Sequence, residues 1–119
     1  MTDRRRALGR AAEEHAAAYL QHHGYVIVAR NWRCAAGELD LVARDGAVLV
    51  FVEVRASRQH LGRALESIGP VKQRRLAELA YCYLATHPPA PSDWRIDVIA
   101  LAWRDDGWQV QHLRAAVGE

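Results

Sequence analysis

The residues with the clearest chemical potential are three acids, Glu38, Asp40 and Glu53, which interrupt a stretch that is otherwise rich in apolar residues. Carboxylates held close together repel one another, and the repulsion grows when the groups lose water. A divalent cation removes that repulsion, and Mg²⁺ typically takes one or two carboxylates together with waters and substrate phosphates. The three acids therefore predict a site for Mg²⁺ or Mn²⁺.

A hairpin signal lies between these acids. The dipeptide Asp45-Gly46 separates two apolar-rich runs and is typical of a two-residue turn. A turn there would place Glu38 directly across from Glu53, with Asp40 on the diagonal, because side chains alternate along paired strands. The alternative is that the acids are solvated groups at a sheet edge, where they prevent pairing with other chains.

The spacing of the apolar residues predicts two helices and five strands, in the order α-β-β-β-α-β-β. The helices are expected over residues 4–23 and from about residue 71 to the His87-Pro88-Pro89 run, and the strands over 25–29, 38–44, 47–55, 95–103 and 108–113. The third strand connects to the fourth through a helix, so these two are expected to be parallel neighbours. The predicted fold class is α/β, with a mixed central sheet flanked by helices.

The composition is that of one soluble domain covering residues 1–119, with a formal net charge of +2. No apolar run is long enough to cross a membrane, and the basic N-terminus is not followed by the apolar core of a signal peptide. We therefore expect a cytoplasmic protein. Cys34 and Cys82 are far apart in the sequence and have no Cys or His at metal-ligand spacing, so neither a zinc site nor a disulfide framework is expected.

Two segments together form a recognisable motif. Gly37-Glu38-Leu39-Asp40 followed by Phe51-Val52-Glu53-Val54-Arg55 looks like the D-x12-E-x-K variant of the PD-(D/E)xK nuclease signature. The whole chain resembles the small bacterial YraN family, which is itself similar to archaeal Holliday junction resolvases. The other segments that carry this resemblance are Gly9 with Glu13, Gly24-Tyr25, Asn31-Trp32-Arg33, Lys72-Gln73-Arg74-Arg75 and Arg95-Ile96-Asp97-Val98.

The resemblance implies a restriction endonuclease-like fold with an αβββαβ core, and a catalytic site that uses Mg²⁺ or Mn²⁺. Asp40 and Glu53 match the paired metal-binding acids, and Glu13 matches a first-helix glutamate that completes the metal site in the resolvase relatives. Glu38 matches an acid adjacent to the metal pair. Gln73 matches a position on the second helix that is often polar in related nucleases, so it is a further candidate for the catalytic site.

One position departs from the nuclease motif, because Arg55 stands where the motif has lysine. Arginine stays charged, so it could stabilise developing negative charge or orient a phosphate but could not act as a base. Activation of water would then fall to the metal alone. Basic residues that follow the hairpin are candidates for contact with a nucleic-acid backbone, although they would equally suit a solvated helix face: Arg58, Arg63, Lys72, Arg74 and Arg75.

These observations favour a metal-dependent endonuclease that hydrolyses phosphodiester bonds in DNA, with branched or flap structures as plausible substrates by analogy. A homodimer would suit the cleavage of two strands. Arg55 favours an alternative, in which the protein keeps the nuclease fold but has lost turnover and acts as a nucleic-acid-binding protein or adaptor. A third reading is a protein-interaction module that binds no nucleic acid.

Overall fold

The computed structural model describes residues 3–117 and contains three helices and five strands in that range. The order of these elements confirms the predicted αβββαβ core, to which a short helix and a last strand are added. No helix within residues 3–117 is long and apolar enough to span a membrane. The elements are α1 (Asp3–His22), β1 (Val26–Cys34), β2 (Gly37–Asp45), β3 (Val48–Ser57), α2 (Leu61–Glu66), α3 (Pro70–Thr86), β4 (Trp94–Arg104) and β5 (Gly107–Val117).

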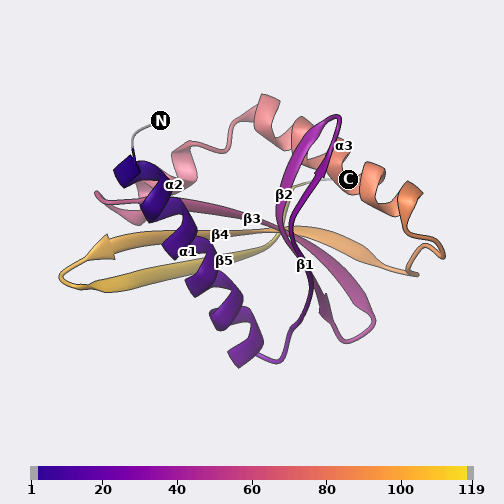
Figure 1. Cartoon of the computed structure of the whole chain (residues 1–119), viewed down its shortest axis with the longest axis horizontal. Coiled ribbons are helices and arrows are strands. Elements are labelled where there is room, and N and C mark those ends of the chain that lie inside the picture. Colours follow the sequence, from indigo (N-terminus) through magenta and orange to yellow (C-terminus); the bar gives the residue numbers. More distant parts are fainter. Residues whose placement is uncertain (1–2, 118–119) are drawn as a thin grey trace.

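The five strands form one mixed sheet in the order β1-β2-β3-β4-β5. β3 and β4 are parallel, as predicted, and the other neighbours are antiparallel. The sheet is strongly twisted, and α1 and α3 cover opposite faces of it (Figure 1). This arrangement confirms the predicted α/β class and is consistent with a restriction endonuclease-like fold.

Each of the two long helices buries one apolar stripe against the sheet. On α1 the stripe consists of small residues, including Ala12 and Ala16, together with Leu20. On α3 it includes Leu76 and Leu79, which belong to the core on the other face. Full burial of one leucine side chain is worth about 2 kcal/mol. The two stripes therefore fix both helices against β2 and β3, the strands that carry the predicted acids.

The turn between β2 and β3 lies one residue later than predicted. Asp45 pairs with Val48, so Gly46 and Ala47 are the turn residues. Gly46 has φ +62°, which glycine adopts without steric cost. Asp45 instead stays in the strand, where its carboxylate lies 3.2 Å from the guanidinium of Arg95.

This change of turn moves the register of the hairpin by two residues. The last regular pair is Leu41 with Val52. Continuation of the same register brings Asp40, rather than Glu38, across from Glu53. The predicted pairing of Glu38 with Glu53 is therefore wrong. Because the shift is by an even number of residues, the paired residues from Leu41 onward keep the faces that the sequence predicted. Leu39 does not, since it lies in the same core cluster as Val42 and not in that of Leu41.

Two further differences concern β1 and α2. β1 continues to Cys34, although a strand ending at residue 29 was predicted. Asn31 interrupts its regular conformation with φ +51°, which asparagine tolerates better than most residues. The short helix α2 was not predicted. His60 caps it, because the His60 Nδ1 atom accepts a hydrogen bond of 3.0 Å from the Arg63 N–H group.

The last hairpin also turns one residue earlier than the predicted Asp-Gly dipeptide. Asp105 and Asp106 are the turn residues, with φ of 52° and 60°. Trp103 and Trp108 form a cross-strand pair beside this turn, and the centroids of the two rings are 5.1 Å apart. β5 extends to Val117, well beyond the predicted end of the strand at residue 113.

Asp97 is a fully buried acid in β4. It accepts hydrogen bonds from Arg95 Nε at 3.0 Å, His112 Nε2 at 2.8 Å and the Ala115 N–H group at 2.9 Å. Burial alone would raise the pKa of Asp97, but these hydrogen bonds outweigh it and hold the pKa below its usual value. Asp97 therefore has a structural role, as the buried partner of a neighbouring arginine.

Candidate functional site

Asp40 lies at the point where β2 separates from β3. The regular pairing of these strands ends at Leu41 and Val52, and the Val54 N–H group instead donates a hydrogen bond of 2.8 Å to Asp40 Oδ2. A buried backbone donor needs a partner, and here the carboxyl group replaces the strand that has moved away. The local divergence of the two strands thus makes room for the Asp40 side chain next to Glu53.

The carboxyl group of Asp40 lies beside that of Glu53, where protonated Asp40 can donate a hydrogen bond to Glu53. Burial, this hydrogen bond and repulsion from Glu53 raise the pKa of Asp40 to about 9. The side chain of Glu53 is buried in the sheet. At neutral pH the carboxyl group of Asp40 is therefore protonated.

Lys72 lies in the first turn of α3 and contacts this acid pair. Its Nζ atom is 2.9 Å from Glu53 Oε2. The contact is an ion pair whose angles do not meet those of a hydrogen bond, so Oε2 has no hydrogen-bond partner among the described residues. The sequence placed Lys72 among the candidate contacts to nucleic acid. The structure brings it to the acids themselves, a position that sequence reasoning missed.

Arg55, the residue at the motif lysine position, makes a different contact. Its Nε atom donates a hydrogen bond of 2.6 Å to Ser67 Oγ, in the segment that joins α2 to α3. The ion pair with Glu53 comes instead from Lys72. A lysine does lie beside the acids, but it comes from α3 instead of β3.

Glu13 and Glu38 form a second acidic pair, and Glu13 is near enough to Asp40 to contribute to the raised pKa of Asp40. The side-chain amide of Asn31 donates a hydrogen bond of 2.8 Å to each of them. Arg33 Nε lies 3.3 Å from the other oxygen of Glu38. The four acids predicted as metal ligands are thus divided, and within residues 3–117 no group of three or more Asp, Glu, His or Cys side chains is arranged to hold a metal ion.

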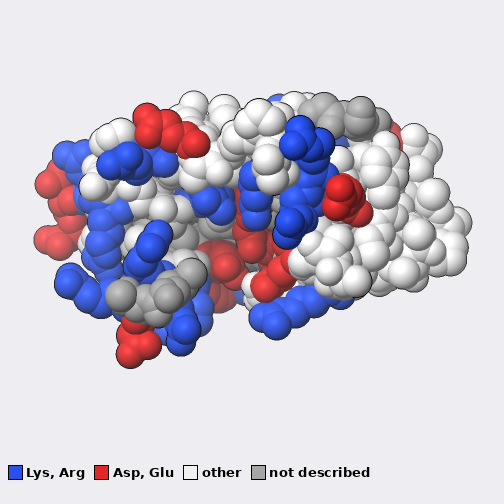
Figure 2. All heavy atoms as spheres, turned by 90° about the horizontal axis from the view of Figure 1, so that it is seen from above, with Lys and Arg blue, Asp and Glu red and all other residues white. Residues whose placement is uncertain are grey.

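Both acidic pairs line one pocket of about 870 Å³. Figure 2 shows acidic side chains gathered in the middle of this face, with lysine and arginine side chains on both sides. Such a surface places positive charge around buried carboxyl groups, which suits a phosphate-containing ligand. The basic residues that line the pocket are Arg5, Arg55, Arg58, Arg63 and Lys72.

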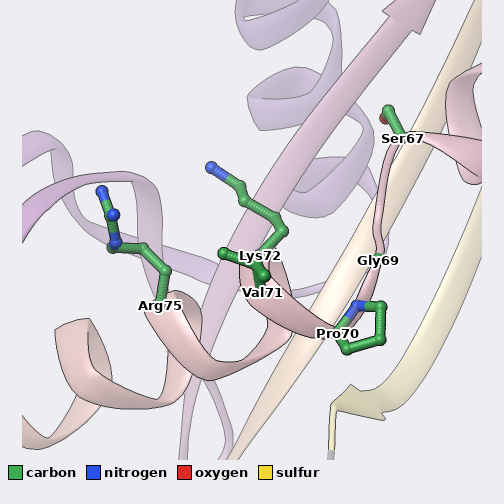
Figure 3. Close-up of a pocket in the computed structure, with 6 residues that line it drawn as sticks. All are labelled: Ser67, Gly69, Pro70, Val71, Lys72 and Arg75. Atoms are coloured by element: carbon green, nitrogen blue, oxygen red, sulfur yellow. The ribbon is translucent and has the colours of Figure 1, made fainter.

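The remaining candidates lie outside this pocket. Arg75 lines a neighbouring pocket of about 430 Å³, together with Lys72, and both side chains extend from the first turns of α3 (Figure 3). Arg74 is exposed and lines neither pocket. Gln73 directs its amide to the Ile68 carbonyl oxygen at 3.5 Å. A catalytic role for Gln73 stays a prediction from the resemblance, because its amide faces the segment before α3.

Comparison with known proteins identifies the family. Residues 12–101 match the group described as "Uncharacterised protein family UPF0102". This chain belongs to that family. The matched span includes every residue of the acid pocket except those in the first two turns of α1, at positions 5, 8 and 9.

Relatives in UPF0102 are similar over their whole length. A UPF0102 protein of Chloroflexus aurantiacus is 55% identical over 97% of this chain and 96% of its own length. One from Roseiflexus castenholzii is 47% identical over 100% of this chain and 99% of its own length. A third, from Ralstonia nicotianae, is 49% identical over 94% of this chain and 87% of its own length.

The hydrogen bonds from Asn31 to Glu13 and Glu38 in this UPF0102 protein give a first testable prediction. We expect Asn31→Asp to lower the free energy of unfolding by about 1 kcal/mol at pH 7, because a carboxylate would replace the donor that holds Glu13 and Glu38. Aspartate tolerates a positive φ nearly as well as asparagine, so the backbone would not cause the loss. Urea unfolding at pH 7 and pH 4 measures the effect. The difference in the free energy of unfolding between the two proteins should shrink at pH 4. Equal stability of the two proteins at pH 7 would contradict the prediction.

Proposed function

We propose that this protein is a Mg²⁺- or Mn²⁺-dependent endonuclease that hydrolyses phosphodiester bonds in DNA in the cytoplasm. The observation that carries this proposal is the contact of two carboxyl groups, Asp40 and Glu53, beside Lys72 in a pocket surrounded by arginines. Close carboxyl groups in a buried place cost stability, and such a cost is typical of functional sites, where the two groups would hold a divalent cation.

The acid pair fits a hard divalent cation. Both groups offer carboxylate oxygens, and Mg²⁺ commonly uses one or two of these while keeping waters and substrate oxygens as its other ligands. Glu53 Oε2 is buried without a hydrogen bond and so has a free lone pair. Asp40 must release its proton to bind the ion, so uptake should strengthen as the pH rises. Glu13 and Glu38 line the same pocket and would add negative charge near the ion.

The ion would supply polarisation of the phosphate and a water of lowered pKa. The protein's own groups would do the rest. The ammonium group of Lys72, which lies 2.9 Å from Glu53 Oε2, would stabilise the negative charge that develops on a phosphate in the pocket. Arg55 is held by Ser67, where it could orient a flanking phosphate. Arg58 and Arg63 would contact the backbone farther along the pocket.

The test of this proposal is cleavage of labelled single-stranded, duplex, flap and four-way-junction DNA with Mn²⁺ or Mg²⁺. The proposal predicts cleavage that requires the metal and is lost in both Asp40→Asn and Glu53→Gln. Salt-dependent binding of DNA without cleavage by any variant would instead support a protein that has lost turnover. If the protein neither binds nor cleaves any of these DNAs, the proposal is overturned in favour of an interaction module.

The two cations near the acids should differ in their effect on this cleavage. We expect Lys72→Ala to reduce the cleavage rate by about 100-fold or more, because it removes a preorganised charge beside the reacting phosphate. Arg55→Ala should reduce it less, since Arg55 contacts Ser67 and neither acid. Arg74→Ala, which removes an exposed charge from the same helix as Lys72, is the matched control. A larger loss in Arg55→Ala than in Lys72→Ala would contradict this assignment.

A further inference from the structure

The first two turns of α1 form one wall of the acid pocket, the pocket of about 870 Å³ that Asp40 and Glu53 line. The residues of these turns that line it are Arg5, Leu8 and Gly9. Their spacing of three and four residues places them on one face of the helix. Figure 1 shows this end of α1 beside α2, which lines the same pocket.

Gly9 is a glycine that the packing of the helix does not require. Glycine inside a helix is destabilising relative to alanine, and Gly9 lies well within α1. A Cβ atom at this position would meet no atom of residues 3–117 within 4 Å, and the backbone is helical there, so alanine would fit without strain. The open space beside Gly9 belongs to the pocket. A ligand in the pocket could therefore approach the backbone of α1 closely at this point.

Arginines are concentrated at the same end of α1. Arg4, Arg5 and Arg6 lie in the first turn, are exposed, and outnumber its one acid, Asp3. Positive charge is unfavourable at the start of a helix, where the macrodipole is also positive. An anionic group bound beside this turn would remove the unfavourable interaction.

The charges of the pocket favour an extended anion over a small one. Arg5 lines it from α1, and Arg58 and Arg63 line it from the segment around α2. The acids lie in the same pocket, and Glu53 Oε2 is buried there without a hydrogen-bond partner among the described residues. A chain of phosphates presents negative charge repeatedly along its length, so it can meet both basic groups at once.

We propose that the pocket side of α1, formed by Arg5, Leu8 and Gly9, is a contact surface for the phosphate backbone of DNA. One phosphate pairs with Arg5, and the backbone is in van der Waals contact with the helix at Gly9. The inference rests on the proposed function for the kind of ligand, but it does not require cleavage. It adds α1 to the nucleic-acid contacts expected from the sequence, all of which follow the hairpin.

The first experiment measures the salt dependence of DNA binding by fluorescence anisotropy, with the labelled DNAs of the cleavage test and without divalent cations. Arg5→Ala should weaken binding at least about 5-fold at about 100 mM KCl, and should reduce the slope of log K against log [KCl] by about 1, because one phosphate contact is lost. Arg10→Ala is the matched control. It removes an exposed charge of α1 that lines neither pocket, so the slope should not change.

Substitutions of Gly9 distinguish a DNA contact from a structural role. Gly9→Ala and Gly9→Gln should both melt at or above the temperature of the wild type, because both residues favour a helix more than glycine does and the space for a Cβ atom is open. DNA binding should nevertheless weaken with the size of the side chain, by about 3-fold in Gly9→Ala and at least about 10-fold in Gly9→Gln. A purely structural glycine would give lower melting temperatures and unchanged affinity.

The outcomes separate this inference from the proposed function. Equal salt slopes for Arg5→Ala and the wild type, or wild-type affinity in Gly9→Gln, would overturn the α1 surface and leave the endonuclease proposal standing. The expected effects on binding, found in a protein that cleaves no DNA, would support the surface and overturn the endonuclease. Absence of DNA binding by the wild type would overturn both.

Discussion

Asp40→Asn is expected to make the folded protein more stable at pH 7 while it removes the proposed metal site. The side chain of asparagine has the same shape as protonated aspartic acid, so its carbonyl oxygen can accept the hydrogen bond from the Val54 N–H group. Its amide can donate to Glu53 as the protonated Asp40 does. The substitution therefore keeps the contacts of Asp40 and removes only its tendency to ionise.

The sign follows from the pKa of Asp40, which burial first and Glu53 second raise from 3.8 to about 9 in the folded state. Between these values the unfolded chain releases the proton that the folded chain keeps, so the free energy of unfolding falls as the pH rises. The free energy of unfolding falls by at most about 1.4 kcal/mol for each pH unit, so the loss at pH 7 has an upper limit of about 4 kcal/mol. We expect Asp40→Asn to recover about 1–3 kcal/mol of this.

Urea unfolding at pH 5, 7 and 8.5 measures this effect. The stability of Asp40→Asn should exceed that of the wild type by an amount that grows with pH. Asp93→Asn, at an exposed loop position, is the matched control and should show no such trend. A destabilised Asp40→Asn at pH 8.5 would contradict the account.

The opposite result is expected for Asp97→Asn, which should lower the free energy of unfolding by about 3–5 kcal/mol. Asp97 is fully buried, and its carboxylate is the partner of Arg95 and His112. Asparagine would leave the Arg95 guanidinium without its buried anion and would offer an amide in place of one acceptor oxygen. Urea unfolding at pH 7 gives the magnitude, and Asp93→Asn again serves as the exposed control.

The contribution of Asp97 should also depend on acid pH. Its pKa is lowered in the folded state, so its stabilising effect is complete above the unfolded value of 3.8 and is lost as the pH falls through the folded value. The difference between wild type and Asp97→Asn should therefore narrow below about pH 4. A constant difference from pH 7 to pH 3 would show that the carboxylate charge is not what stabilises this region.

Much of the fold could be predicted from the sequence because the apolar spacing follows the helix and strand periods. The parallel pairing of β3 and β4 followed from the helical connection between them. The register of the β2–β3 hairpin was harder to predict. The dipeptide Asp45-Gly46 suits a turn at either of two positions, and the choice is linked to Arg95, a residue of β4 that holds Asp45 in the strand.

Less of the site could be predicted, because its contacts join segments that are distant in the sequence. Strand alternation predicted that Asp40 and Glu53 lie near each other, but their direct contact depended on the correct register. Lys72 reaches Glu53 because of where α3 begins after α2, a helix that the sequence did not reveal. Asn31 could be singled out from the sequence only because it lies in the Asn31-Trp32-Arg33 segment that carries the family resemblance. Its positive φ and its hydrogen bonds to Glu13 and Glu38 depend on the tertiary structure.

The central claim is that the carboxyl groups of Asp40 and Glu53 hold a divalent cation. Titration of the protein with Mn²⁺, followed by the electron paramagnetic resonance signal of the free ion, tests it most directly. We predict one bound Mn²⁺ per chain, with an affinity that increases from pH 6 to pH 8, and at least about 10-fold weaker binding in Glu53→Gln. Glu66→Gln, which changes an exposed residue of α2, should bind Mn²⁺ as tightly as the wild type does. Absence of binding by the wild type, or equal binding by Glu53→Gln and wild type, would contradict the account.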